Sequence, residues 1–166
     1  MKKISYLIFI IVFLIFISGC SGYKPIFAST NLQFKISEYS IEGNKILGNK
    51  IYSKLYRLSK TQKNDQNARS LGFLIKVSKD KNATSKNSAG KILEYKITLK
   101  TEVKVTDSIT DDKILNETFV SSLTYKMQNQ YSDTVNLENT TIENLINKIY
   151  KELLIKFSEN LVTKWL

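Results

Sequence analysis

A long, unbroken alternation near the middle of the chain constrains its fold most. From Leu93 to Val105 every second residue is aliphatic, aromatic or threonine. A period of two predicts a β-strand with one face against a core and the other in solvent. Shorter alternations predict three further strands, over residues 32–41, 71–77 and 115–127. The polar segment 107–113 is expected to be a hairpin turn, and the Lys- and Asn-rich segment 78–90 is expected to be a long loop.

Two other segments carry apolar residues at helical spacing. The stripe that begins at Ile46 predicts an amphipathic helix over residues 44–59. A second stripe, from Ile142 to Leu161, predicts the clearest helix of the chain. We expect it to begin at Thr140, because Thr140 with Glu143 forms a capping-box pattern, although Asp133 could cap an earlier start. Residues 128–139, which include Tyr131, are otherwise expected to be a polar connection.

This order of elements predicts an α+β fold. The simplest arrangement is a two-layer sandwich, in which both helices cover one face of a four-stranded sheet. The order along the chain is strand, helix, three strands and helix. The three consecutive strands are expected to pair as an antiparallel meander. The first strand is separated from the second by a helix, so it can lie parallel to a neighbour and make the sheet mixed.

The N-terminus has the pattern of an export signal. Lys2 and Lys3 precede an apolar run over residues 6–17, and the small pair Ser18 and Gly19 follows. The run is short for a bilayer span, which takes about 20 apolar residues. The chain's one cysteine, Cys20, comes next, so the chain cannot form an internal disulfide.

The residues around this cysteine, Ile17-Ser18-Gly19-Cys20, resemble the lipobox of bacterial lipoproteins. The resemblance implies that the Cys20 thiol receives a diacylglycerol and that cleavage makes it an acylated N-terminus. We therefore expect residues 1–19 to be a signal peptide that is removed, 20–30 a lipidated tether and 31–166 a single domain. The alternatives are an ordinary signal peptide with an incidental cysteine, or a short membrane anchor.

Composition argues against most catalytic chemistry. The chain has no histidine, which excludes a His-based triad and a His-ligated metal. Its six glycines are scattered and form no phosphate-binding loop. We therefore expect no enzyme, no metal site and no cofactor. The net charge of +10 favours an anionic partner, such as a membrane surface or an anionic glycolipid. Export and the lack of a nucleic-acid-binding motif argue against nucleic acid.

Together these features resemble the LPS-assembly lipoproteins, the LptE (formerly RlpB) family. The resemblance is carried by the lipobox and by the segment Gly22-Tyr23-Lys24-Pro25-Ile26-Phe27. Members of that family commonly begin Cys-Gly-Phe/Tyr-x-Pro-Leu before a β-α-β-β-β-α domain, which is the order predicted here. Ser21 departs from the pattern, because it lies between Cys20 and Gly22.

The resemblance implies a non-enzymatic lipoprotein on the periplasmic side of the outer membrane. Proteins of that family plug the lumen of the β-barrel LptD, assist its assembly and contact lipopolysaccharide on its way to the outer leaflet. On this interpretation the candidate contacts for lipopolysaccharide are Lys79, Lys81, Lys86 and Lys91, and a solvated loop is the alternative. Ser21 fits sorting to the outer membrane, because aspartate after the cysteine is the usual signal for retention in the inner membrane.

Two other functions share the anchor and the predicted fold class. The first is an envelope lipoprotein that binds and activates a cell-wall synthase or serves a lipid transporter. The second is a periplasmic enzyme on a tether, for which the sequence offers no catalytic side chains.

Overall fold

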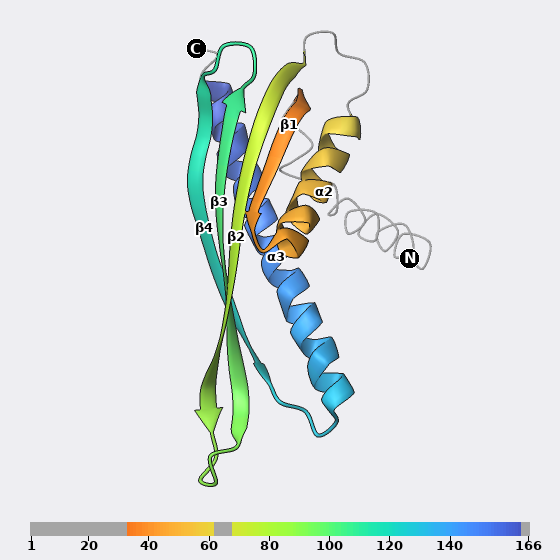
Figure 1. The fold of residues 1–166 in the computed structure, drawn as a ribbon, viewed down its shortest axis with the longest axis vertical. Helices are drawn as coiled ribbons and strands as arrows, with labels where there is room; N and C mark the ends of the chain where they lie inside the picture. The colour runs from red at the N-terminus through yellow and green to blue at the C-terminus, as the bar shows by residue number, and fades with distance from the viewer. Residues whose placement is uncertain (1–32, 62–67, 164–166) are drawn as a thin grey trace, which may run out of the picture. The chain divides into compact units, whose positions relative to one another are not determined.

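The computed structural model describes residues 33–61 and 68–163, which lie within one compact unit that begins at Leu32. The predicted signal peptide, Cys20 and the tether fall outside the described residues. The elements are β1 (Phe34–Gly43), α2 (Lys45–Thr61), β2 (Arg69–Lys86), β3 (Ile92–Asp107), β4 (Lys113–Lys126) and α3 (Tyr131–Thr163) (Figure 1).

The four strands form one sheet in the order β1-β2-β3-β4. β1 pairs parallel with β2, whereas β2 with β3 and β3 with β4 pair antiparallel. Both helices cover the same face of this sheet: α2 packs on β1 and β2, and α3 packs mainly on β4 (Figure 1). The predicted α+β fold, with the order β-α-β-β-β-α and a mixed sheet, is confirmed.

The reversal from β1 into α2 depends on two residues. Gly43 ends β1 with a positive φ of 69°, which glycine adopts at low cost. The backbone N–H of Asn44 then donates to the carbonyl of Val77 at 2.7 Å. The side-chain Oδ1 of Asn44 accepts from the backbone N–H of Leu47 at 3.2 Å and so caps α2. This junction ties the start of α2 to β2.

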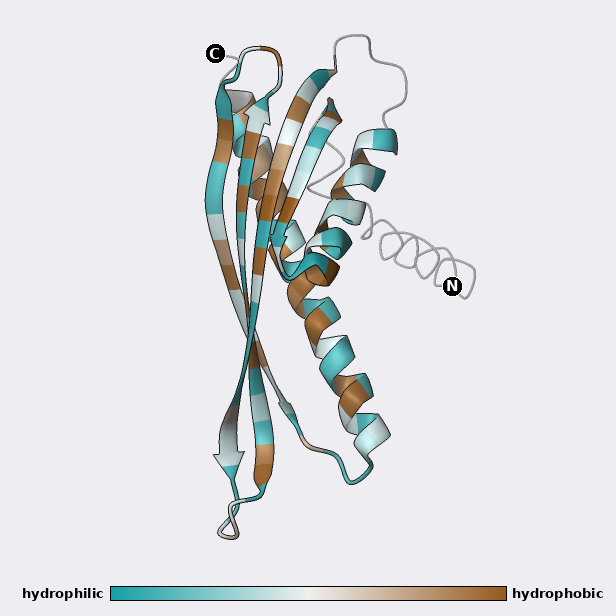
Figure 2. Ribbon diagram, viewed as in Figure 1, coloured by the Kyte–Doolittle hydropathy of each residue, from teal (hydrophilic) through white to brown (hydrophobic). Residues whose placement is uncertain are grey.

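The core lies between the helices and the covered face of the sheet. At its centre the Phe157 ring of α3 meets the Phe34 ring of β1 edge-on, with centroids 5.2 Å apart, and the Phe73 ring of β2 at 5.9 Å. Figure 2 shows hydrophobic bands that recur along α3 and alternate along the strands, as both periods require. Other fully buried side chains include Ile51, Leu55, Leu71, Ile75, Leu99, Leu145 and Leu153.

The predicted loop over residues 78–90 is wrong for most of its length. β2 continues without a break to Lys86 and pairs with β3 through that residue. Only the tight turn at the hairpin tip remains, where Asn87 Oδ1 accepts from the backbone N–H of Ala89 and of Lys91. The segment lacks apolar alternation because most of its side chains are exposed on both faces, so the strand is held by its pairing with β3.

The predicted start of the last helix is also wrong. α3 begins at Tyr131, nine residues before Thr140, so the alternative of an earlier start, near Asp133, is the correct one. Thr140 lies inside the helix, where its hydroxyl donates to the Asn136 carbonyl at 2.9 Å. Within the described part of the chain, neither helix is long and apolar enough to cross a bilayer.

Candidate functional site

Two of the candidate lysines lie where β2 extends past the end of β1. Lys79 and Lys81 are opposite Leu99 and Ile97 of β3, both of which are buried in the core. Side chains directly opposite each other share one face of a sheet. The two lysines therefore project from the helix-covered face, toward the first turns of α3, and not from a free loop.

Both lysines meet one carboxylate of α3, that of Glu138. Lys81 Nζ donates to Glu138 Oε2 at 2.6 Å, and Lys79 Nζ lies 3.8 Å from Glu138 Oε1. The Tyr125 hydroxyl of β4 donates to the same Oε2 at 2.8 Å. About a third of each lysine side chain and a fifth of that of Glu138 are exposed. Two cations thus share a single anion at a half-open position.

Two tyrosines form the floor beneath this ion pair. The rings of Tyr95 and Tyr125 stack across β3 and β4 with centroids 5.9 Å apart. Lys81 Nζ lies 4.4 Å from the Tyr95 centroid and 5.6 Å from the Tyr125 centroid, within the range of a cation–π interaction. We call Lys79, Lys81, Tyr95, Tyr125 and Glu138 the Glu138 cluster.

The contacts of the Glu138 cluster hold its charges in place. Burial lowers the pKa of Lys81, but the hydrogen bonds with Glu138 and Tyr125 outweigh it and raise that pKa to about 12. Burial raises the pKa of Glu138, but the hydrogen bonds from Lys81 and Tyr125 outweigh it and lower that pKa. Burial is the main cause that raises the pKa of the Tyr125 phenol. At neutral pH the cluster therefore carries two positive charges and one negative charge.

Replacing Glu138 with glutamine is expected to lower the free energy of unfolding by about 1–2 kcal/mol at pH 7, because two lysines lose their shared anion. The pKa of Glu138 is lowered by folding, so its stabilisation is present above the unfolded-state pKa and is lost as the pH falls through the folded-state pKa. The difference between wild type and Glu138→Gln, measured by urea unfolding, should shrink below about pH 4.

The matched control for this variant is Glu159→Gln, on the same helix. Glu159 pairs with Lys156 at 2.9 Å, and both side chains are more than half exposed, so its loss should change the free energy of unfolding by less than about 0.5 kcal/mol. A Glu138→Gln effect that stays constant from pH 7 to pH 3 would show that the carboxylate charge is not what stabilises the cluster.

The other two candidate lysines lie at the tip of the β2–β3 hairpin. Lys86 ends β2, opposite Ile92, and Lys91 follows Gly90 in the turn. Both side chains are exposed. The structure therefore separates the four candidates into a pair within the Glu138 cluster and a pair at the tip of the hairpin.

Sequence reasoning did not find the acidic partner of these lysines. The sequence predicts a polar connection over residues 128–139, yet Glu138 lies in α3 and faces β2, 57 residues away in sequence from Lys81. Alternation predicts strands that contain Tyr95 and Tyr125, but it does not indicate that these rings lie beside Glu138. The one available signal was Asp133 as an alternative helix start, because extending the helix to that residue places Glu138 one turn before the apolar Ile142.

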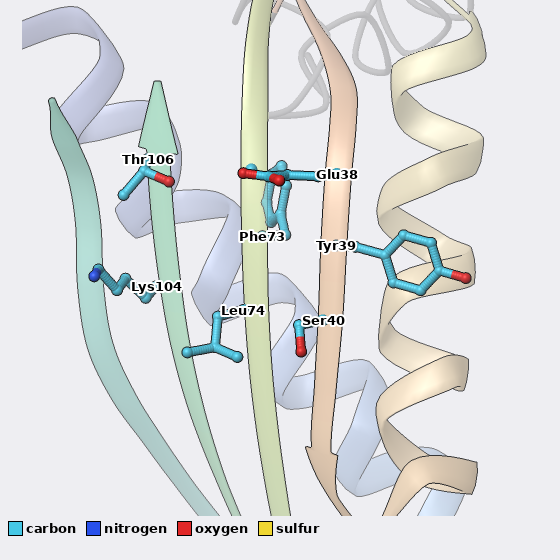
Figure 3. Close-up of a pocket in the computed structure, with 8 residues that line it drawn as sticks. Glu38, Tyr39, Ser40, Phe73, Leu74, Lys104 and Thr106 are labelled. Carbon is cyan, nitrogen blue, oxygen red and sulfur yellow. The ribbon is translucent and has the colours of Figure 1, made fainter. Parts of the chain in front are cut away.

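The uncovered face of the sheet carries a shallow hollow of about 280 Å³. It forms around Gly72, where a side chain would meet the Glu38 carboxylate at 2.9 Å. Figure 3 shows Glu38 extending over β2 while Tyr39 points the opposite way, toward α2, with Lys104 and Thr106 on β3. One carboxylate and one ammonium group make neither a metal site nor a nucleophile–base pair. In the described residues, no group of three potential metal ligands occurs.

Comparison with known proteins shows what the fold is. No protein-family model matches the chain, and no curated protein matches it. Among solved structures, rare lipoprotein B from Shewanella oneidensis matches with a TM-score of 0.54 at 15% identity, covering 76% of this chain and 98% of that one. A candidate lipoprotein from Caulobacter crescentus matches with a TM-score of 0.53 at 10% identity, covering 76% and 90%. This chain therefore has the fold of rare lipoprotein B, as the resemblance in its sequence predicted.

Proposed function

We propose that this chain is a non-enzymatic lipoprotein, anchored through Cys20 to the periplasmic side of the outer membrane. It plugs and helps to assemble the LptD β-barrel and assists the transport of lipopolysaccharide to the outer leaflet. The observation that carries this proposal is the match to nearly the full length of rare lipoprotein B, in a chain whose residues 17–20 resemble a lipobox. Residues 1–19 are then the signal peptide, 20–30 the tether and 31–166 the domain.

The charge of the domain supports an anionic ligand. The side chains of Lys79 and Lys81 share one carboxylate, so the Glu138 cluster keeps one positive charge uncompensated among its own members. Lys86 and Lys91 add two exposed charges at the hairpin tip. Lysine ammonium groups bind phosphate through charge-assisted hydrogen bonds. We propose that these four lysines contact the phosphates of lipopolysaccharide.

Co-purification in mild detergent tests the function directly. The tagged, lipidated protein should carry with it a large outer-membrane barrel at one-to-one stoichiometry, identified by mass spectrometry. A cell-wall synthase or a transporter component in place of the barrel would overturn the function, although the anchor and the fold would stand. The purified complex also allows the four lysines to be tested, since replacing them by glutamine should reduce crosslinking to lipopolysaccharide.

Changing Cys20 to alanine tests the anchor separately. The variant should remain uncleaved or unlipidated, because the modified thiol is missing, and it should incorporate no labelled acyl chain. The measurement is metabolic acyl labelling together with electrophoretic mobility of the processed form, with Cys20→Ser as the isosteric control. Acyl labelling equal to that of wild type would contradict lipidation at this residue.

A further inference from the structure

The outer face of α2 carries charge of one sign. Over Lys45–Thr61 the helix has five basic residues and no acidic residue. Its apolar stripe, which includes Leu47, Ile51 and Leu55, is buried against the sheet. The opposite side of the helix is exposed and carries Lys45, Arg57 and Lys60.

Nearby carboxylates offset little of this charge. On α3, Glu143 forms an ion pair with Lys50. The acidic residues of the adjacent strand, Glu38 and Glu42, belong to the alternate positions of β1 that face away from the helices; Glu38 lines the hollow on the uncovered face. The outer face of α2 therefore presents positive charge along its length.

Tyrosine rings border the same face. The Tyr39 ring of β1 stacks on Tyr52 with centroids 3.9 Å apart, and Tyr52 lies 5.8 Å from Tyr56. Lys60 Nζ lies 4.6 Å from the Tyr56 centroid. Tyr39 is 53% exposed and Tyr56 39%. Exposed tyrosines beside lysine are typical of surfaces that meet lipid headgroups, since the ring enters the interface while its hydroxyl stays wet.

An apolar side chain also projects from this face. Ile46, in the first turn of α2, is 72% exposed. An exposed isoleucine gains no free energy in water, but it is stabilised when a bilayer interface buries its apolar area. We call Lys45, Ile46, Tyr56, Arg57 and Lys60 the α2 basic face.

We propose that the α2 basic face rests on an anionic bilayer, with its cations at the phosphates of the lipid headgroups. The inference rests on the proposed lipid anchor only for proximity. Cys20 precedes Phe34 by fourteen residues, and a fully extended chain of that length spans at most about 50 Å. Each basic residue at an anionic membrane surface strengthens binding by about 1 kcal/mol, or about 5-fold. This contact with the bilayer is additional to the proposed role in the LptD barrel and does not require the barrel to be present.

The test uses the full chain, purified in detergent and reconstituted into vesicles, so that its N-terminal part holds it there in every sample. A membrane-impermeant acetylating reagent is applied, and mass spectrometry gives the acetylation rate of each lysine. Lys45 and Lys60 should react at least about 5-fold more slowly in vesicles that contain phosphatidylglycerol than in pure phosphatidylcholine. High salt should abolish the difference, because it screens exposed charges.

Exposed lysines of the uncovered sheet face are the internal reference and should react equally in both kinds of vesicle; they are Lys76, Lys96 and Lys104.

Two triple variants that lose the same amount of charge then show whether the protection depends on the α2 basic face or on the net charge of the protein. Lys50, an exposed lysine of the same helix, should also be protected by phosphatidylglycerol in the wild type, and Lys45→Gln, Arg57→Gln and Lys60→Gln together should remove that protection. Lys76→Gln, Lys96→Gln and Lys104→Gln together should leave it unchanged. Equal acetylation of Lys45 and Lys60 in both kinds of vesicle, or equal loss of protection in both variants, would overturn the proposal. Neither result depends on whether LptD co-purifies.

Discussion

Replacing Gly43 by alanine is expected to lower the free energy of unfolding by about 2–4 kcal/mol. Gly43 has a φ of 69°, a conformation that costs a residue with a Cβ about 1 kcal/mol or more. The added Cβ would lie 2.3 Å from the Val77 carbonyl oxygen. That oxygen accepts the N–H of Asn44, so the clash also disturbs the hydrogen bond that ties α2 to β2, at a further 1–3 kcal/mol or so.

Gly90→Ala is the matched control for this variant. Gly90 has nearly the same dihedral, a φ of 77°, but a Cβ there would meet nothing within 4 Å. It should therefore show the dihedral cost alone, about 1 kcal/mol. Urea unfolding of both variants in non-ionic detergent, followed by far-ultraviolet circular dichroism, measures the difference. If the two alanines destabilised equally, the contact with Val77 would not limit the close approach of β1 to β2.

The sheet could be predicted from sequence where one of its faces is buried. The alternation in β3 reflects odd positions that enter the core from Ile97 onward, where the structure buries Ile97, Leu99 and Val103. The same rule failed beyond Val77, where the side chains of β2 are largely polar and exposed. Its strand conformation there comes from hydrogen bonding to β3, which is independent of side-chain polarity.

The start of α3 was misjudged for a related reason. Residues 131–141 have a mixed face: Thr134 and Thr141 are buried, Leu137 packs partly on the core, and the charge of Glu138 is satisfied by two lysines of β2. A helix that packs through polar contacts lacks the apolar period that reveals a helix in sequence. The capping-box pattern therefore predicts a helix start at Thr140, which lies inside the longer helix α3.

The Glu138 cluster could not be predicted, because it depends on four separate elements. β2 supplies the cations, α3 the carboxylate, and β3 and β4 the aromatic floor. Alternation shows that two residues share a face but not which residue of a distant helix lies above them. The shared fold carries no information on this point either, since function resides in sites that differ among proteins of one fold.

The core should be most sensitive to substitution at Phe157. Phe157→Ala is expected to lower the free energy of unfolding by about 3–5 kcal/mol, the usual range for removing a buried phenylalanine. Its side chain is fully buried and contacts the rings of Phe34 and Phe73 edge-on, a geometry that stabilises beyond the burial of area. The loss is a large share of the 5–15 kcal/mol or so that holds a typical domain folded.

Two further variants define the physical origin of that loss. Tyr131→Ala removes an aromatic ring from the same helix, but Tyr131 is 81% exposed, so urea unfolding should detect a change of less than about 0.5 kcal/mol. Phe157→Leu retains most of the buried volume and should recover more than half of the loss caused by alanine. If Phe157→Ala cost no more than Tyr131→Ala, the last turns of α3 would not be packed on β1 and β2, and the link between the first strand and the last helix would be lost. A full loss in the leucine variant would instead assign the stability to the ring contacts with Phe34 and Phe73, because leucine fills the space without them.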